Sequence, residues 1–326
     1  MPTRQQQHID RALTNISVAY MQDLNNFIAD KVFPVVPVQK QSDLYFIYSK
    51  EDFLRDEAAE RANGTESAGG DYNVDQSEPY FCRVIGFHKD VTEQDRVNAD
   101  QPLDVDKDAT EFVSMKLLIR REAQWAEKFF KEGIWGKEIS GEDTVSTPET
   151  QTLRWDNPAS DPVKAVKNAA TKMQETTGYR PNTLVLSPYA KDALLEHPDV
   201  IDRIKYTQKG IASIDLLAQL FEVKNVYVAQ AISNRAAKGA KENTTFIMGK
   251  HALLCYAEPS PGLKKPSAGY IFAWKGLKGA GAYGNRVVRI PMPWLGMDTE
   301  RIEGEMAYDM RQVSKDLGVF FKGIVK

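Results

Sequence analysis

The feature that most constrains the fold is a long stretch of helical periodicity between about residues 106 and 132. No Gly or Pro interrupts it, and Gly133 is expected to end it. At 1.5 Å per residue such a helix is about 40 Å long, which exceeds most helices of compact single domains. We therefore expect a spine helix whose inward stripe recurs every three or four residues, formed by Phe112, Met115, Leu118, Ile119, Glu122, Ala126, Phe129 and Phe130.

The composition fits a globular protein that can bury a real core. The chain has 326 residues, of which 42% are hydrophobic and 27% charged, so we expect one large or two medium domains. Its formal net charge of −3 is too balanced for a protein dedicated to neutralising nucleic-acid phosphates. The N-terminus lacks a signal-peptide pattern and no stretch approaches the roughly 18 apolar residues of a membrane helix. We therefore expect a cytosolic product without membrane contact.

The N-terminal part predicts an arm followed by two strands around a long insertion. Apolar residues over 5–30 favour one or two short amphipathic helices, and Pro34 and Pro37 then impose an extended path. Strands are expected at 44–48 and 80–87. The segment between them is acidic and rich in Gly, Ser and Asn. An insertion of this length is usually either functional or disordered.

The middle of the chain predicts alternating helices and strands. Asp161, Pro162 and Gly178 occupy the positions of an N-cap, a first helical residue and a C-terminal glycine. A strand at 183–187, a helix that starts at Ser187 and Pro188, a helix at 211–221 and a strand at 223–229 complete a compact α/β unit. The rest of the chain predicts hairpin strands at 301–325, preceded by short strands at 246–249, 253–256, 270–274 and 287–290.

No constellation of catalytic or metal-ligating residues emerges. A GxGxxG match ends at Gly284, but a β-branched run follows it where a dinucleotide fingerprint requires a helix. Cys82 and Cys255 belong to no CxxC pair and are expected to be buried thiols. His197 is expected to hydrogen-bond carbonyl groups at a helix end. We expect no enzyme activity, no cofactor and no metal; a nucleotide-dependent enzyme built on 160–270 is the alternative from another class, because a fold does not fix a function.

Five segments carry a resemblance to a known family through their order along the chain. They are ADKVFPVVPVQKQSDLYFIYSKEDFLRDEAAERANGTES, RVNADQPLDVD leading into a helix with IRRE, GYRPNTLVLSPYAKDALLEHPDVIDRIKYT, LAQLFEVKNVYV and the closing DLGVFFKGIV. This order resembles the major capsid (head) proteins of tailed bacteriophages, with the Hong Kong 97 fold. The fold class it implies is α+β, with an N-terminal arm, an extended β-hairpin loop, a spine helix with a long β-sheet, and an axial α/β domain.

The resemblance also implies a division of the chain and a set of partners. The N-terminal arm would be 1–42, the extended loop 43–92, the peripheral domain 93–155 with 285–326, and the axial domain 160–270. The implied function is a structural protein that assembles through hexamers and pentamers into an icosahedral head around double-stranded DNA, made in the host cytoplasm and located in the virion. The implied partners are copies of itself, a separate scaffolding protein, a portal, a decoration protein and packaged DNA without sequence preference. An encapsulin-like bacterial compartment is the alternative within the same fold.

Two segments of opposite charge suggest how neighbouring subunits meet. Residues 51–80 hold nine acids and two arginines, a net charge of −7, whereas residues 259–297 hold six bases and no acid. We expect the loop of one subunit to dock near the basic segment of its neighbour, unless that segment faces packaged DNA instead. The candidate loop residues are Asp52, Arg55, Asp56, Glu57, Glu60, Arg61 and Asp71. The candidate basic residues are Lys275, Lys278, Arg286 and Arg289.

Overall fold

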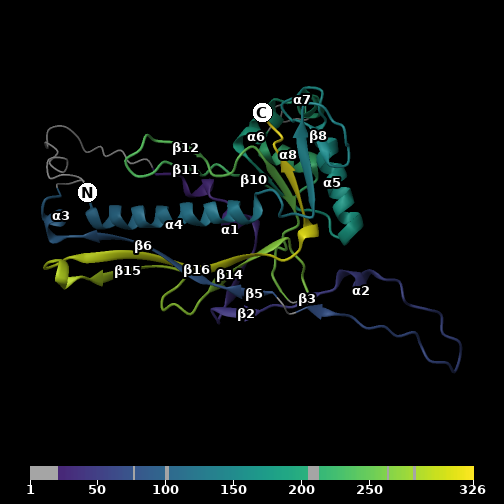
Figure 1. Ribbon diagram of the computed structural model, residues 1–326, viewed down its shortest axis with the longest axis horizontal. Coiled ribbons are helices and arrows are strands. Elements are labelled where there is room, and N and C mark those ends of the chain that lie inside the picture. The colour runs from purple at the N-terminus through teal and green to yellow at the C-terminus, as the bar shows by residue number, and fades with distance from the viewer. Residues whose placement is uncertain (1–20, 76–77, 100–102, 205–212, 263, 282–283) are drawn as a thin grey trace.

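The computed structural model describes residues 21–75, 78–99, 103–204, 213–262, 264–281 and 284–326. Figure 1 shows an elongated molecule in which helix α4 (Val105–Phe129) runs along a long sheet. A body of helices and strands lies at one end of α4, and a long loop projects away from the sheet. The mixed α+β class and the long helix expected from the sequence are therefore confirmed.

The helix α4 buries a face that differs from the expected stripe. Asp104 caps its first turn by accepting a hydrogen bond from the Lys107 amide. Phe112, expected to face inward, is 45% exposed. The buried apolar positions are four or eight residues apart, and only the last of them belongs to the expected stripe: Ala109, Val113, Leu117, Trp125 and Phe129.

This correction has a physical reason, because α4 packs on two faces instead of one. The buried face meets the long sheet, whereas a second face packs on a smaller cluster that contains Phe27 and Ile247. That second face holds four residues of the expected stripe, Met115, Leu118, Ile119 and Ala126. The last part of the stripe is buried as expected, at Glu122, Phe129 and Phe130. The helix also ends at Phe129, and Gly133 takes a positive φ of 79° in the turn that follows.

The sheet beside α4 has five strands in the order β1-β14-β16-β15, with β6 paired to the other edge of β16. Pro37 lies within β1, an edge strand, where the missing N–H of proline is tolerated. Gly304 of β16 lets α4 approach, since an added Cβ would lie 2.6 Å from Val113 Cγ1. The strands are β1 (Val35–Val38), β6 (Arg83–Val91), β14 (Gly269–Trp274), β15 (Asn285–Pro291) and β16 (Glu300–Gln312).

The α/β body is built on a six-stranded sheet in the order β10-β9-β13-β17-β7-β8. Its core is a separate apolar cluster in which Trp155, Leu184 and Phe321 are fully buried. The strands are β7 (Lys137–Glu142), β8 (Gln151–Leu153), β9 (Thr183–Leu186), β10 (Asn225–Val228), β13 (Ala252–Cys255) and β17 (Gly318–Lys322). The helices are α5 (Pro162–Thr177), α6 (Pro188–Glu196), α7 (Pro198–Ile204) and α8 (Ile214–Phe221).

The expected helix boundaries in this body are confirmed. Asp161 accepts a hydrogen bond from the Lys164 amide at the start of α5, and Gly178 ends that helix with a φ of 78°. Ser187 caps α6 in the same way, by accepting from the Ala190 amide. Helix α7 was not expected from the sequence. Helix α8 was expected to begin at residue 211 but begins at Ile214, and residues 211–212 lie outside the described part.

Four expected strands differ in the structure. The strand expected at 44–48 is split into β2 (Ser42–Leu44) and β3 (Ile47–Tyr48), which pair with different partners. The strand expected at 80–87 is split into β5 (Pro79–Phe81) and β6, which pair with β2 and β16 respectively. The strand expected at 246–249 contributes only Phe246, the last residue of β12 (Thr244–Phe246), which pairs with β11 (Ile232–Asn234). The tail does not form a hairpin, because β16 belongs to the long sheet and β17 to the six-stranded sheet. The turn between them contains the 3-10 helix η4 (Lys315–Leu317).

The N-terminal helices are only partly within the described residues. From Met21 onward they reduce to the short 3-10 helix η2 (Leu24–Asn26) and the one-turn helix α1 (Ala29–Val32). The earlier part of the expected segment lies outside the described residues. The GxGxxG match leads into β15, not into a helix, so the structure confirms the reason for which a dinucleotide fingerprint was rejected.

Candidate intersubunit surfaces

The extended loop projects from the long sheet with little cover from its own chain (Figure 1). Its base is made by two short antiparallel pairs, β2 with β5 (Pro79–Phe81) and β3 with β4 (Val74–Asp75). The one-turn helix α2 (Lys50–Leu54) leads into the tip, where every residue from 53 to 73 is exposed. Five large apolar side chains of the loop are each more than half exposed, namely Leu44, Phe46, Phe53, Leu54 and Tyr72.

A few contacts within the loop hold its two limbs together. Asp52 accepts a hydrogen bond from the Asn73 amide at 2.9 Å, and this bond lowers the pKa of the carboxyl group. Tyr48, Phe53 and Tyr72 form an aromatic cluster with ring centroids 5.5 to 6.0 Å apart. The middle of the loop is therefore shaped before any partner arrives.

The charged candidates of the loop fall into two groups. Arg55 pairs with Glu57 at 3.0 Å, and Asp71 accepts from the Tyr72 amide at 2.8 Å. Asp56, Glu60 and Arg61 are exposed at the tip. The tip therefore presents acidic groups to solvent with few cations of its own loop beside them.

A buried carboxylate fastens the base of the loop to the long sheet. Asp309 of β16 accepts hydrogen bonds from the Phe81 amide at 3.1 Å, Lys128 Nζ at 2.9 Å and Arg311 Nε at 2.6 Å. Burial alone would raise the pKa of Asp309, but these donors outweigh it and hold the pKa below its usual range. Beside this clamp, Tyr80 stacks on Phe272 with ring centroids 4.6 Å apart.

The four basic candidates do not form one free patch. Arg286 lies 2.5 Å from Glu305 in the neighbouring strand, and Arg289 lies 3.8 Å from Asp106 and from Glu300. Both arginines are thus partly neutralised within their own chain. Lys275 and Lys278 follow β14 and are exposed. These two lysines remain as candidates for a partner's acidic groups.

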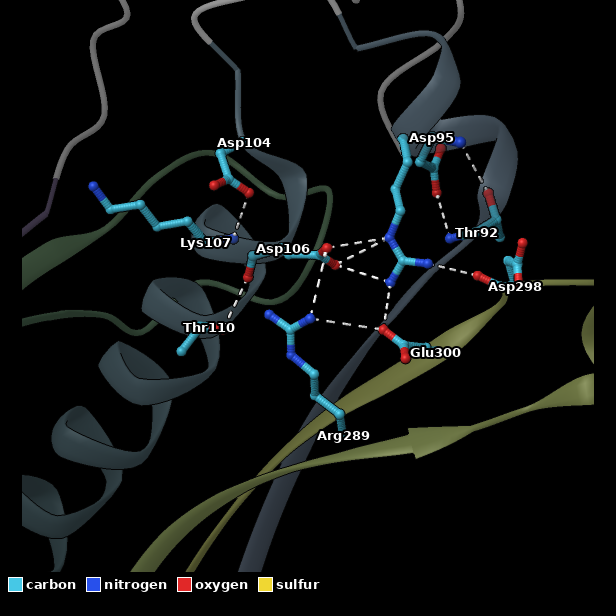
Figure 2. A network of polar contacts seen from close by, with 10 residues as sticks. Thr92, Asp95, Asp104, Asp106, Lys107, Thr110, Arg289, Asp298 and Glu300 are labelled. Atoms are coloured by element: carbon cyan, nitrogen blue, oxygen red, sulfur yellow. Dashed lines mark hydrogen bonds and ion pairs between the residues drawn. The ribbon is translucent and has the colours of Figure 1, made fainter.

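At the N-terminal end of α4, an ionic network joins elements that are far apart in the sequence (Figure 2). Arg96 of α3 (Glu93–Val97) contacts Asp106 at 3.0 Å, Glu300 at 2.7 Å and the Asp298 carbonyl at 2.6 Å. Figure 2 shows Arg289 approaching the same two acids from β15. The sequence analysis missed this network, because only the Thr92 and Asp95 capping box of α3 is visible as a local signal.

The hairpin tip beyond this network exposes large apolar side chains. Trp294 is 70% exposed and Met297 is 83% exposed, next to the 3-10 helix η3 (Pro293–Leu295). Val97 of α3 is 76% exposed. Such exposure at the end of a long sheet is typical of a surface that a partner covers.

The segment 28–30 is fastened to α4 by a buried acid. The Glu122 carboxylate accepts from the Ile28 and Ala29 amides at 3.0 to 3.2 Å, and the adjacent Arg121 pairs with Asp30 at 3.2 Å. Burial raises the pKa of Glu122 to about 7. The signal for this site was a glutamate within the expected apolar stripe, whose role the sequence analysis did not infer.

The cysteines and His197, which were considered for catalytic or metal-binding roles, have surroundings typical of residues that only support the fold. Cys82 and Cys255 are free and buried, as expected, and burial raises the pKa of Cys82 to about 11. His197 is buried at the end of α6, with Nε2 3.2 Å from the Asn157 carbonyl, which agrees with the expected role. In the described ranges, no group of three or more His, Cys, Asp or Glu side chains could hold a metal ion. No helix within those ranges is long and apolar enough to span a bilayer.

Comparison with known sequences gives consistent matches. Residues 140–265 match the family described as phage major capsid protein E. The major capsid protein of Burkholderia phage BcepMu is 28% identical over 280 residues, which cover 82% of this chain and 84% of that protein. The major capsid protein of Pseudomonas phage JBD67 is 27% identical over 327 residues and 97% of both chains. Both relatives are structural capsid proteins.

Comparison with solved structures shows the fold. A phage-related protein from Bordetella bronchiseptica RB50 has a TM-score of 0.68 at 21% identity, covering 93% of this chain and 94% of that one. The capsid of cyanophage P-SCSP1u has a TM-score of 0.58 at 12% identity and covers 99% and 98%. The SrpI encapsulin of Synechococcus elongatus PCC 7942 has a TM-score of 0.57 at 11% identity and covers 97% and 95%. The phage relatives favour a phage capsid over an encapsulin: the chain is similar over most of its length to major capsid proteins of phages, and its role is that of a structural protein of the virion capsid.

Proposed function

We propose that this chain assembles through hexamers and pentamers into an icosahedral shell around double-stranded DNA, and that its extended loop lies across a neighbouring subunit. The observation that carries the proposal is the loop itself. It exposes Phe53, Leu54 and Tyr72 by more than half each and keeps its shape through its own contacts. Apolar groups left uncovered on a preformed element are stabilised when a second copy buries them.

The proposed division of labour follows the Hong Kong 97 fold. The arm is 1–42, the loop 43–92, the peripheral domain 93–155 with 285–326, and the axial domain 160–270. The position of α4 beside the long sheet supports the peripheral part, and the six-stranded sheet supports the axial part. Strand β17 of the closing segment lies within the six-stranded sheet, so the two parts share one continuous framework.

The proposed docking partner of the loop is the basic segment of a neighbouring subunit. Its exposed lysines, Lys275 and Lys278, suit the acidic tip around Asp56 and Glu60. Within the chain, the basic segment already meets the loop through a cation–π contact, in which Lys264 Nζ lies 5.2 Å from the Tyr48 ring centroid. Packaged DNA is the competing partner for these lysines, since phosphate attracts any exposed cation. A scaffolding protein, a portal and a decoration protein complete the proposed partners.

A deletion tests the role of the loop. Removing residues 56–70 and bridging the ends with a short Gly-Ser linker should leave a soluble, folded protein, because this segment is exposed throughout. We expect the variant to form no shells by negative-stain microscopy. A matched deletion of 237–241, also exposed, in the β11–β12 connection should assemble normally. Normal shells from the 56–70 deletion would contradict the proposal.

The encapsulin alternative differs in what the shell contains. It deserves a test because the SrpI encapsulin shares the fold. Shells purified after infection and treated with nuclease should retain protected double-stranded DNA of uniform length. Shells that instead contain a cargo protein and no protected DNA would favour the encapsulin-like protein compartment.

A further inference from the structure

A pocket in the α/β body has no part in the assembly described above. It lies between α5 and the β7–β8 pair and has a volume of about 270 Å³. Three lysines line it, Lys137 from β7 and Lys164 and Lys172 from α5, and we call it the lysine pocket. Asn168 stands midway between the two helix lysines, and this spacing of four residues places all three on one helix face. Thr152 of β8 adds a hydroxyl group from the opposite wall.

The lining of the lysine pocket holds one more basic side chain than acidic side chains. Within the described ranges, no ion pair joins any of the three lysines to a carboxylate. Two acids also line the pocket, Asp161 and Glu149. The Asp161 carboxylate already accepts from the Lys164 amide at 2.9 Å and lies 3.7 Å from the Arg203 guanidinium. Glu149 acts electrostatically on Lys137, so the charged side chains that line the pocket have a net charge of +1.

The two lysines on opposite walls act on each other directly. Burial lowers the pKa of Lys137 and the adjacent Lys172 ammonium lowers it further, and these two effects outweigh Glu149 and Glu175, which raise it. Two like charges side by side are unfavourable, and one anion between them would remove the repulsion. The arrangement is thus suited to a bound anion.

We propose that the lysine pocket binds a phosphate group. Phosphate matches the lining, because its several oxygens can accept hydrogen bonds from more than one ammonium, the Asn168 amide and the Thr152 hydroxyl together. A carboxylate has only two oxygens and a single charge, and would leave part of these donors unused. The group could be free inorganic phosphate or a phosphate of a nucleic-acid backbone, and the chemistry of the site is the same for both.

Titration calorimetry with inorganic phosphate tests the site on the full, unassembled chain at constant ionic strength. We expect saturable binding, weakened about ten-fold by Lys137→Gln and by Lys172→Gln, as for the loss of one charge-assisted hydrogen bond. Lys224→Gln, an exposed lysine of the same body, is the matched control and should bind as wild type. Phosphate binding that neither pocket variant weakens would overturn the proposal, as would acetate that binds as tightly as phosphate.

A second arm distinguishes the two sources of the phosphate. A fluorescein-labelled DNA duplex is titrated with the same proteins and followed by anisotropy. Duplex binding that Lys137→Gln weakens and inorganic phosphate displaces assigns the site to nucleic acid. Phosphate binding without duplex binding assigns it to the free anion. Absence of saturable binding by both probes overturns the site.

Discussion

Single residues decide how closely the elements of this capsid protein approach. A Cβ at position 304 would lie 2.6 Å from Val113 Cγ1 and 2.8 Å from Leu117 Cδ1, both in the buried seam between α4 and β16. We expect Gly304→Ala to lower the free energy of unfolding by about 1 to 3 kcal/mol, because the seam must be pushed apart. Gly69→Ala, with nothing within 4 Å, is the control and should change it by less than about 0.5 kcal/mol. Equal stability of the two variants by chemical denaturation would contradict this packing.

Glu122, the buried acid that holds Ile28 and Ala29, should make stability depend on pH. Folding raises the pKa of Glu122 from 4.5 to about 7, so the unfolded chain releases this proton first as pH rises. The contribution of Glu122 is fully present below its unfolded pKa and is lost as pH rises through the folded value, by on the order of 3 kcal/mol. Glu122→Gln cannot ionise and should therefore gain stability relative to wild type over this range.

Urea unfolding on either side of this range measures the effect. The difference in unfolding free energy between Glu122→Gln and wild type should shift in favour of the variant between about pH 4.5 and pH 8, since this range spans the unfolded pKa of Glu122 and its folded pKa of about 7. Glu127→Gln, exposed on the same helix, should show no such shift. A constant difference for Glu122→Gln at both pH values would argue against an acid that is protonated in the folded protein.

At the scale of elements, the base of the loop depends on one clamp. Asp309 joins the Phe81 amide of β5 to Lys128 of α4 and Arg311 of β16. Asp309→Asn removes the charge that both cations share, so amides at 80–83 should exchange with deuterium about ten-fold faster, while β9 and β13 stay protected. Asp316→Asn, which breaks an exposed pair with Lys50, should have little effect. Unchanged exchange at 80–83 in Asp309→Asn would show that the aromatic stack alone holds the loop.

Elements whose ends are set by residues within them or next to them could be predicted from the sequence. Contacts between residues that are distant in the sequence could not. The two ends of α5 follow from Asp161 and Gly178, which act within one turn of the helix. The route of the tail could not be seen, because β16 and β17 have similar patterns and only their distant partners assign them to different sheets. The Arg96 network likewise joins residues more than 200 positions apart. The acidic loop was recognised from composition, but pairing of Arg286 and Arg289 within the chain required the structure.

At the scale of the whole molecule, opposite charges are expected to guide the loop onto its neighbour. Replacing Lys275 and Lys278 with Glu should slow the assembly of empty shells in low salt, as measured by light scattering. Replacing Asp56 and Glu60 with Lys in the same protein should partly restore the rate of assembly. Each exposed pair contributes only roughly 0.2 to 1 kcal/mol and is screened over about 8 Å at physiological ionic strength. Normal empty shells with reduced DNA retention would instead assign these lysines to the shell interior.

Electron cryomicroscopy of particles formed by the full chain tests the central claim most directly. The account predicts closed shells of hexamers and pentamers in which density for residues 53–73 lies against a neighbouring subunit and covers Phe53 and Tyr72. A chain that stays monomeric across concentration, salt and added scaffolding protein would contradict it, as would shells in which the loop folds back onto its own subunit.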